Sequence, residues 1–423
     1  MNPIRRKRFW ISLGLTALTM LALRVPLAYA DPLTLREAIE RALRFAPSIA
    51  NAAASTDLSD AQMRELRAAM YPAVNASGEY TQSPGYDEVI TNRGMTRAQI
   101  ELNYTAFDFG RRMSKVRAAR YALEAARYGI AASRAQIIFD TTVAYLDLMR
   151  AKHAVLETQA NVDRLGRYVD TIDRLRRTGR AIENDALKVR TTRDAAEIAL
   201  SDASNDRQRA AEVLGSMIGD FASRDFEITD LVELPKPPAA DLAQSPAMRA
   251  AIRQIQSSKM EVQAAQEERY PTFQVALTAG ALGVDPANTF GDHYGASYDG
   301  ILSVPIFDGG LITSHIDQAM AKKLQAIAQA RAIEYDLRRR IDAALLHYQR
   351  ALGELSILTR ALPNAQDAFA LTWTRFLGGG TATLLEVLDA YEQAENLRIS
   401  RIQQDFEARQ SAAEVAMLYG VNQ

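Results

Sequence analysis

Few side chains in this sequence have the types and spacing needed for chemistry. Cysteine is absent from the 423 residues, which excludes disulfides, thiolate catalysis and cysteine-ligated metal. The histidines show no spacing typical of a metal site or a catalytic triad; they are His153, His293, His315 and His347. The glycine run 378–380 is followed by Thr381 and not by the lysine of a phosphate-binding loop, so it predicts a turn between helices. We therefore expect no enzyme, no cofactor and no metal site.

The remaining candidates are charged residues that follow two glycine turns. Glu386 and Asp389 are three residues apart, so on one helix they share a face. Asp185 and Lys188 have the same spacing after Gly179. A solvated helix face is one explanation, because exposed charges are the usual case on helices. The other explanation is a group of carboxylates that binds cations. Which explanation holds depends on where the predicted helices place these residues.

The N-terminus predicts a secretory signal peptide over residues 1–30. Basic residues 5–8 precede the apolar segment 9–23, and Ala28-Tyr29-Ala30 is a typical cleavage site. A membrane anchor is the alternative, but the apolar segment is shorter than the ~20 residues that a span needs. Without cysteine there is no lipid attachment, so we expect a secreted and unlipidated protein. Cleavage removes five positive charges and changes the formal net charge from -1 by five, to -6, which disfavours nucleic acid as a partner.

The mature sequence is a tandem duplication with an offset of about 200 residues. Four matches occur in the same order in both halves: Tyr71-Pro72 with Tyr270-Pro271, Phe107-Asp108-Phe109-Gly110 with Phe307-Asp308-Gly309-Gly310, Gly179 with Gly380, and 210–213 with 412–415. We expect one repeat over residues 31–220 and a second over 244–423. Between them, residues 221–243 contain several prolines and predict a stiff polar linker.

Both repeats predict long helices. Thr34 and Glu37 have the spacing of a capping box at the start of the first repeat, and helical sequence continues to Met70. A longer helical segment runs from Asp108 to about Thr178, which corresponds to roughly 100 Å of helix, and its counterpart runs from Asp308 to about Arg375. Second helices follow over 181–218 and 381–419. Apolar residues at three- and four-residue steps predict coiled-coil packing of the second long helix; they are Ile316, Met320, Leu324, Ile327, Leu337, Ile341, Leu345, Tyr348 and Leu352.

Between the helices, each repeat contains a hairpin of alternating apolar and polar residues, over about 71–107 and about 270–307. This alternation is typical of transmembrane barrel strands, but an amphipathic sheet in a soluble domain shows it too. Aromatic residues at the helix-proximal ends of the strands favour a membrane interface; they are Tyr71, Phe107, Tyr270 and Phe307. The polar segments 83–95 and 280–296 would be the loops on the far side.

No later segment is an apolar helix long enough to cross a membrane, so a membrane protein would enter the bilayer as strands. Four strands cannot close a barrel around side chains, because the smallest barrels use about eight. Membrane strands here therefore predict an oligomer, and three chains would supply twelve strands.

The strand-to-helix junctions have a local explanation. Asp108 and Asp308 are placed to accept hydrogen bonds from the free amides of the following helix. Gly110 and Gly310 permit the sharp change of direction between strand and helix. An ordinary turn would have the same parts, and what distinguishes these two is their occurrence at equivalent points of both repeats.

Together these motifs resemble the TolC-like outer-membrane efflux protein family, over essentially the whole mature chain. The resemblance rests on LTLREAIERAL at 33–43, NYTAFDFGRR at 103–112, SVPIFDGG at 303–310 and GTATLLEVLDAYEQAE at 380–395. It implies an α+β membrane protein that forms a homotrimer. The trimer would have a twelve-stranded transmembrane β-barrel, four strands per protomer, continued by a long α-helical coiled-coil tunnel across the periplasm.

The same resemblance implies a function and partners. The chain would be the outer-membrane exit duct of a tripartite efflux pump or a type I secretion system, and it would conduct substrate passively. Its partners would be a periplasmic adaptor (membrane fusion protein) and an inner-membrane ABC or proton-driven transporter. A periplasmic coiled-coil adaptor or structural protein is the alternative. An adaptor needs a membrane anchor and soluble modules, and the sequence shows neither.

In that family the periplasmic tip is gated, and acidic side chains surround its narrowest point. Glu386 and Asp389 match the two acidic positions, six and nine residues after the turn glycine Gly380. Asp185 matches the first of them in repeat one, where Lys188 replaces the second. Gly179, Gly379 and Gly380 would form the hairpin turns. Some relatives have arginine where this sequence has Ala382, so we expect the contacts that close this gate to differ.

Overall fold

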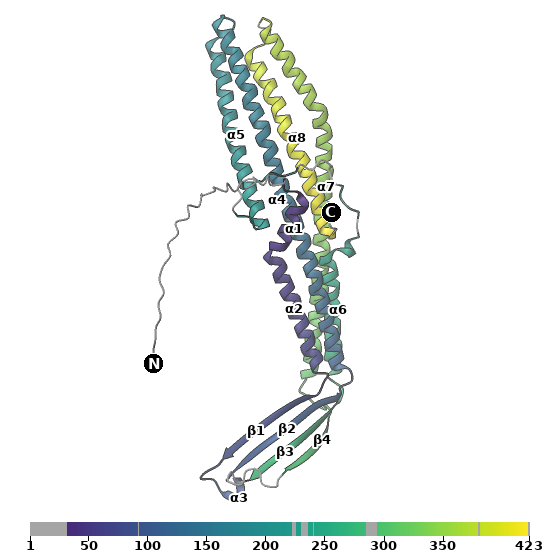
Figure 1. The fold of residues 1–423 in the computed structure, drawn as a ribbon. Coiled ribbons are helices and arrows are strands. Elements are labelled where there is room, and N and C mark those ends of the chain that lie inside the picture. Colours follow the sequence, from purple (N-terminus) through teal and green to yellow (C-terminus); the bar gives the residue numbers. More distant parts are fainter. Residues whose placement is uncertain are drawn as a thin grey trace, which may run out of the picture.

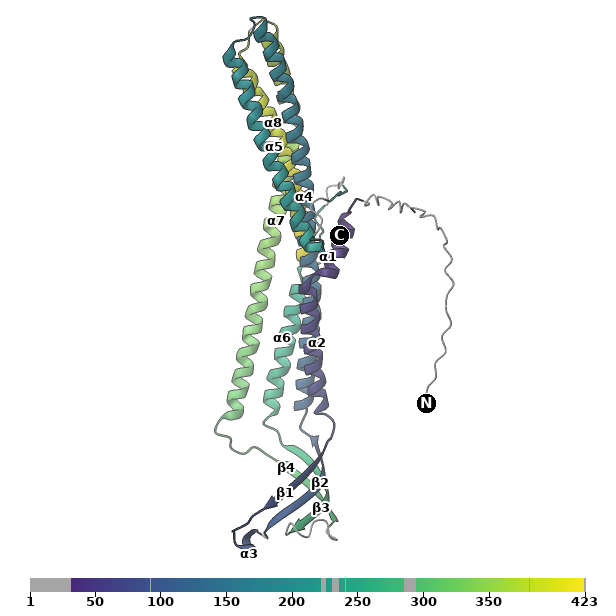
Figure 2. The ribbon, with the colours of Figure 1, turned by 60° about the vertical axis from the view of Figure 1, so that its left-hand side comes forward.

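The computed structural model describes residues 32–91, 93–221, 226–229, 236–239, 241–284, 294–379 and 381–421. The molecule is elongated, with a sheet at one end and two helical hairpins whose turns lie at the other (Figures 1 and 2). The expected signal peptide 1–30, the turn residue Gly380 and much of the expected linker 221–243 lie outside the described residues.

The sheet has four antiparallel strands in the order β1-β2-β3-β4, namely β1 Ala73–Gln82, β2 Gly94–Phe107, β3 Thr272–Val284 and β4 Tyr294–Ser303. Its register aligns apolar residues across the sheet, in the row Val74, Leu102, Leu277, Tyr298. The adjacent row is polar and consists of Asn75, Glu101, Thr278 and Ser297. Because neighbouring residues of a strand point to opposite faces, one face of the sheet is apolar and the other polar. Among the described residues, the outer strands β1 and β4 leave both sheet edges unpaired.

The far-side loops differ in detail from the expectation. The segment 83–95 contains a one-turn helix, α3 Glu88–Thr91. The second loop is shorter than 280–296, because β3 continues to Val284, which pairs with Met95. The continuation requires glycine at position 280, where a Cβ atom would lie 2.2 Å from the carbonyl oxygen of Ala98. Glycine in this segment therefore allows close strand approach and does not end the strand.

Three pairs of helices repeat in length as well as in order. The first copy contains α1 Leu35–Phe45, α2 Pro47–Ala68, α4 Arg111–Arg177 and α5 Glu183–Ile218; the second contains η1 Leu242–Gln244, α6 Pro246–Glu267, α7 Leu311–Leu377 and α8 Leu384–Tyr419. α2 and α6 each have 22 residues, α4 and α7 each have 67, and α5 and α8 each have 36. The internal duplication expected from the sequence is confirmed. Of the helices in the described residues, none combines the length and apolar character needed to cross a membrane.

The main apolar core lies midway along the molecule, where α1, α4, α5 and α8 meet. Tyr145 of α4 is fully buried in it, and its hydroxyl lies 2.9 Å from the carbonyl oxygen of Leu33 and 2.7 Å from that of Thr229. Leu33 also pairs with Ile228 in an isolated parallel bridge. The core therefore attaches the beginning of the chain and part of the linker to the long helices.

The apolar residues expected to form one narrow stripe on α7 lie on more than one face. Ile316, Leu337 and Ile341 are buried as expected, whereas 66% of Leu324 is exposed, and Met320 is exposed too. A straight helix has 3.6 residues per turn, so an apolar pattern of shorter period drifts around it over many turns. In its half nearer the sheet, α7 is the outermost helix on one side (Figure 2), so part of its apolar surface has no partner among the described residues.

Candidate functional site

The junction of β2 with α4, here called junction one (residues 107–112), is held by polar contacts. The carboxylate of Asp108 accepts hydrogen bonds from the backbone amides of Gly110 at 3.3 Å and Arg112 at 2.9 Å. The Arg112 guanidinium donates to the same carboxylate at 2.9 Å, to the carbonyl oxygen of Ala69 at 2.9 Å and to that of Thr105. One arginine thus connects the end of α2, strand β2 and the start of α4.

The charge of Asp108 is stabilised although its side chain is buried. Burial by itself raises the pKa of this carboxyl, but the hydrogen bonds and the positive charge of Arg112 outweigh it, so the pKa lies below its ordinary value. The backbone turns through two left-handed residues, Phe109 (φ 55°) and Gly110 (φ 98°). A positive φ is unusual for a bulky residue, and here the Phe109 ring stacks on Tyr270 with centroids 5.2 Å apart.

Junction two (residues 307–312) has the same cap in an exposed setting. Asp308 accepts from the amides of Gly310 at 2.9 Å and Ile312 at 2.8 Å, and these backbone hydrogen bonds lower the pKa of its carboxyl. Gly309 and Gly310 both have positive φ. Phe307 is 91% exposed. Ile312 occupies the position that Arg112 has in the first copy, so no side chain there connects the sheet to the helices.

The end of the first helical hairpin, here called tip one (residues 171–190), is bounded by ion pairs between α4 and α5. Arg190 lies 2.8 Å from Asp173, and Arg176 lies 2.7 Å from Glu183. The hydrogen bonds from Arg190 lower the pKa of Asp173. Asp185 faces the start of its own helix, where its carboxylate accepts from the amide of Ile182 at 3.3 Å.

The end of the second hairpin, tip two (residues 372–391), positions the predicted acidic pair. Thr383 and Glu386 form a capping box: the amide of Thr383 donates to the Glu386 carboxylate at 2.9 Å, and the amide of Glu386 donates to the Thr383 hydroxyl at 3.3 Å. Asp389 is exposed one turn further along. Gly379 has φ 133°, which favours glycine, and Gly380 lies outside the described residues.

The sequence predicts Glu386 only as an acid of the gate, whereas in the structure it is also a helix cap. The signal was present, because Thr383 and Glu386 have the same spacing as Thr34 and Glu37. Ala382 is buried and makes no polar side-chain contact. A polar contact between the two tips comes instead from the other hairpin, where the Arg180 guanidinium donates to the carbonyl oxygen of Leu377. Asp185, Glu386 and Asp389 form no common cluster: in the described part of the chain, no three acidic or histidine side chains are grouped to hold a metal ion.

Between the tips and the central core, four charged side chains join the hairpins. This four-charge cluster consists of Glu157 and Arg164 on α4 and Glu395 and Arg398 on α8. Each of its arginines lies beside both of its glutamates. Arg164 lies 2.8 Å from Glu157 and 2.7 Å from Glu395, and Arg398 lies 3.1 Å and 3.6 Å from the same two carboxylates. Burial raises the pKa of Glu395. The sequence gives no signal for this cluster, because its two helices are more than 200 residues apart.

An aromatic group lies beside this cluster, toward the tips. Tyr168 of α4 contacts Trp373 and Phe369 of α7 and Tyr391 of α8, with ring centroids 4.8–5.6 Å apart. The Tyr391 hydroxyl donates to the side-chain oxygen of Asn161, and burial raises the pKa of Tyr391 to about 12. These contacts fix the relative position of three helices below the turns.

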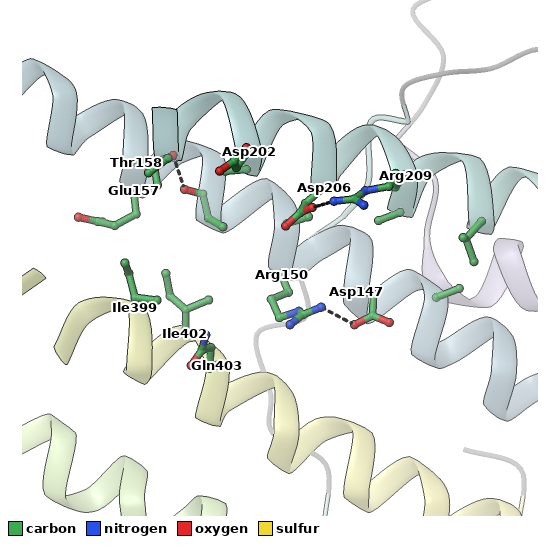
Figure 3. A pocket seen from close by; sticks show the side chains of 17 residues that line it. Asp147, Arg150, Glu157, Thr158, Asp202, Asp206, Arg209, Ile399, Ile402 and Gln403 are labelled. Carbon is green, nitrogen blue, oxygen red and sulfur yellow. Dashed lines mark hydrogen bonds and ion pairs between the residues drawn. The ribbon is translucent and has the colours of Figure 1, made fainter. Parts of the chain in front are cut away.

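A groove of about 590 Å³ runs between α4, α5 and α8 on the side of the hairpins (Figure 3). Alanines of α4 and α5, among them Ala151 and Ala203, line much of it. Its arginines are paired with acids: Arg150 lies 3.1 Å from Asp147, and Arg209 contacts Asp206. The groove therefore combines an apolar lining with arginines that are already paired.

Comparison with known proteins identifies this architecture. The family model described as "Outer membrane efflux protein" matches the chain twice, over residues 38–220 and 239–421. The chain belongs to the outer membrane efflux protein family. As a member of it, the chain is an outer-membrane exit duct, and the fold class, function and location expected from the sequence are confirmed. The family is one of channel proteins, which does not support the adaptor alternative.

Individual relatives agree with this assignment. The outer membrane protein TolC of Escherichia coli (strain K12) is 24% identical over 373 residues, which cover 81% of this chain and 73% of TolC. The outer membrane efflux protein BepC of Brucella suis is 21% identical over 375 residues, covering 88% of this chain and 81% of BepC. Among solved structures, the outer membrane protein VceC of Vibrio cholerae superposes with a TM-score of 0.80 at 20% identity, over 91% of this chain and 96% of VceC.

Proposed function

We propose that three copies of this chain form one continuous duct. Both sheet edges are unpaired in the described part of the chain, and open strand edges are not tolerated in lipid. Three chains supply twelve strands, enough to close a barrel with the apolar row facing outward. A neighbouring chain would cover exposed apolar residues of α7 and of junction two, such as Leu324 and Phe307.

The gate of this duct lies at the two tips, and Glu386, Asp389 and Asp185 contribute its acidic side chains. The observation that supports it best is the placement of Glu386 and Asp389, both exposed on the first turns of α8 at the extreme end of the molecule. In a trimer, three copies would surround the axis with carboxylates, which attract cations and repel anions. Conduction is passive, with opening driven by a periplasmic adaptor and energy supplied by an inner-membrane transporter.

Single-channel recording in planar bilayers tests the gate. The variant Glu386→Gln/Asp389→Asn removes two charges per chain, and glutamine at position 386 keeps the capping box. We expect the preference for cations and the block by divalent cations to decrease, because the local negative potential is lost.

The matched control is Glu37→Gln, which changes a glutamate in the first turn of α1, far from the tips, whose amide donates to the Thr34 hydroxyl. We expect this variant to conduct like the unmodified protein. Unchanged ion preference and unchanged divalent block in the double variant would exclude the gate assignment and leave the duct itself in place.

A further inference from the structure

The groove between α4, α5 and α8 has the size of a ligand site. Its volume of about 590 Å³ lies within the range of roughly 300–1,000 Å³ that holds drug-sized molecules. Alanines of α4 and α5 leave this space free, and Ile399 and Ile402 of α8 line its other side. Sites for small molecules are mostly apolar and contain a few polar groups that orient the ligand. The polar groups of this groove therefore decide which class of molecule fits it.

The duplication shows that the repeated helical plan does not require this groove. α4 and α7 begin at positions 111 and 311, an offset of 200 residues, and α5 and α8 begin at 183 and 384, an offset of 201. At the matching positions the second hairpin has larger side chains, namely Leu358 for Thr158 and Gln404 for Ala203. The small residues that open the groove therefore belong to the first hairpin.

One acid of the groove has an uncompensated charge. Arginines pair with the other three acids that line it, which are Asp147, Glu157 and Asp206. Asp202 is exposed, and its carboxylate makes no ion pair or hydrogen bond with any residue that the structure describes. Figure 3 marks an ion pair for Asp147 and for Asp206 but none for Asp202. The counterpart of Asp202 in the second hairpin is the neutral Gln403. The groove thus places one free negative charge beside apolar surface.

The groove opens on the same side of the hairpins as the acids of the tips. Residues seven apart on packed helices stay on about the same side, with a drift of about 20° per heptad. Two and three heptads after Asp185, α5 reaches Ala199 and Asp206, and both line the groove. Two heptads after Asp389, α8 reaches Gln403, which lines it too. With the tip acids at the gate, the groove therefore lies in the inner wall of the duct.

The described segments that join the repeats lie on another side of α4. The Tyr145 hydroxyl contacts the carbonyl oxygens of Leu33 and Thr229. Asp147 is two residues further along α4, which places it about 200° away around the helix at roughly 100° per residue. The core that attaches these segments and the groove therefore occupy different faces of the same helix, and the described part of the linker leaves the groove open.

We propose that this groove is a binding site for amphipathic organic cations in the wall of the duct. This inference rests on the proposed function and names a substrate class. The apolar body of the molecule lies against the alanines and Ile402, and its cationic group pairs with Asp202. Solvent screens an exposed pair of this kind, so the attraction is modest. Modest affinity suits conduction, because a conducted molecule must leave its site as readily as it enters. An anion of the same shape is repelled by Asp202.

Fluorescence anisotropy on the full-length protein in detergent tests this site. The probes are rhodamine 6G, an aromatic cation, and fluorescein, an aromatic anion of similar shape, and each is also measured in detergent alone. We expect rhodamine 6G to bind at least about tenfold more tightly than fluorescein, with a difference that shrinks between ~50 and ~500 mM salt, because exposed charges are screened. Equal affinity for the two dyes would overturn the proposal.

Two variants test the two parts of the site. Asp202→Asn removes the charge at constant size, and we expect the affinity for rhodamine 6G to fall about fivefold, the effect of one charge pair in water. Its control is Asp194→Asn, which changes an exposed aspartate of the same helix outside the groove. Ala199→Leu fills part of the groove and should also weaken binding, whereas Ala195→Leu, outside it, should not. Circular dichroism and trimer content verify folding. Unchanged affinity in either groove variant contradicts the assignment.

The acids at the gate are the competing site for a cationic dye. Binding that is lost in Glu386→Gln/Asp389→Asn and kept in Asp202→Asn would place the dye at tip two and exclude the groove.

Current recording in planar bilayers separates this site from the duct itself. Rhodamine 6G should reduce the ion current reversibly, and Asp202→Asn should weaken this block to the same degree as it weakens binding. Binding that depends on Asp202 without any block would place the groove outside the conducting path and overturn the proposal. A preparation that conducts but does not bind the dye overturns this inference alone, whereas one that binds the dye through Asp202 and never conducts overturns the proposed duct.

Discussion

Junction one and junction two begin with the same aspartate cap and the same left-handed glycine, but the contacts around the cap differ. At junction one the carboxylate is buried, and Arg112 connects it to two backbone carbonyls from other elements. At junction two the carboxylate is exposed and Ile312 stands in place of the arginine. The aspartate cap satisfies the free amides at the start of a helix, so it occurs at both junctions. The role of Arg112 depends on neighbouring elements that are present only at junction one.

The difference follows from position in the sheet. Junction one adjoins β2, which has a strand on each side, and junction two follows β4, which is at the edge. Within one chain, the interior junction can be covered by its own side chains, and the edge junction can not. Apolar residues at the edge are suited to a neighbouring chain, where a charged arginine would need a partner.

The largest expected effect comes from making junction one like junction two. Arg112→Ile removes the partner of a buried carboxylate and leaves two carbonyl oxygens without their donor. We expect the free energy of unfolding to fall by about 3 kcal/mol, the scale for breaking a buried ion pair. Urea unfolding followed by circular dichroism measures it. The adjacent Arg111→Ile is the control, and an equal loss in both variants would contradict the role given to Arg112.

A smaller effect is expected when Asp108 and Asp308 are compared by the dependence of the Tm on acidic pH. The pKa of Asp108 is lowered in the folded state, so its contribution to stability is present above the unfolded pKa of about 4 and is lost as pH falls through the lower folded pKa. Asp108→Asn should therefore reduce the acid sensitivity of the Tm below about pH 4. Asp308→Asn should change it less, because that carboxylate is exposed. Identical curves of Tm against pH for the two variants would contradict the difference described between the two junctions.

The smallest effect on stability is expected from the reverse change, Ile312→Arg. An exposed ion pair with Asp308 adds little, because solvent screens it, so we expect no measurable rise in Tm. The same charge would lie at the edge where a neighbouring chain is proposed to pack, and trimer content on unheated gels should decrease. A clear rise in Tm with full trimer content would mean that the edge junction is open to solvent in the assembly.

Much of the fold could be predicted, because its signals are local or periodic. Strand alternation around Val74 and Ile100 gave the correct faces, and the spacing of Asp108 and Asp308 from the following helices located the junctions. The stripe on α7 was predicted only in part. Sequence periodicity identifies apolar residues, but whether Leu324 has a partner depends on the drift of a 67-residue helix and on which helix lies beside it.

Contacts between distant segments could not be predicted. Arg112 reaches Ala69, 43 residues earlier, and Arg164 pairs with Glu395, 231 residues later. A charged residue on a helix looks the same in sequence whether it is solvated or paired across an interface. The roles of Glu386 and Asp389 at the gate remain predictions, although their location at the end of the molecule is now defined.

The equal lengths of α4 and α7 limit how this chain can change. Each residue added to one helix moves its turn by about 1.5 Å along the axis and rotates it by about 100°. An insertion in α4 alone would therefore separate Arg180 from Leu377 and rotate tip one relative to tip two. Insertions and deletions should therefore be accepted in matched pairs, one in each half of the chain, so that α4 and α7 keep equal lengths.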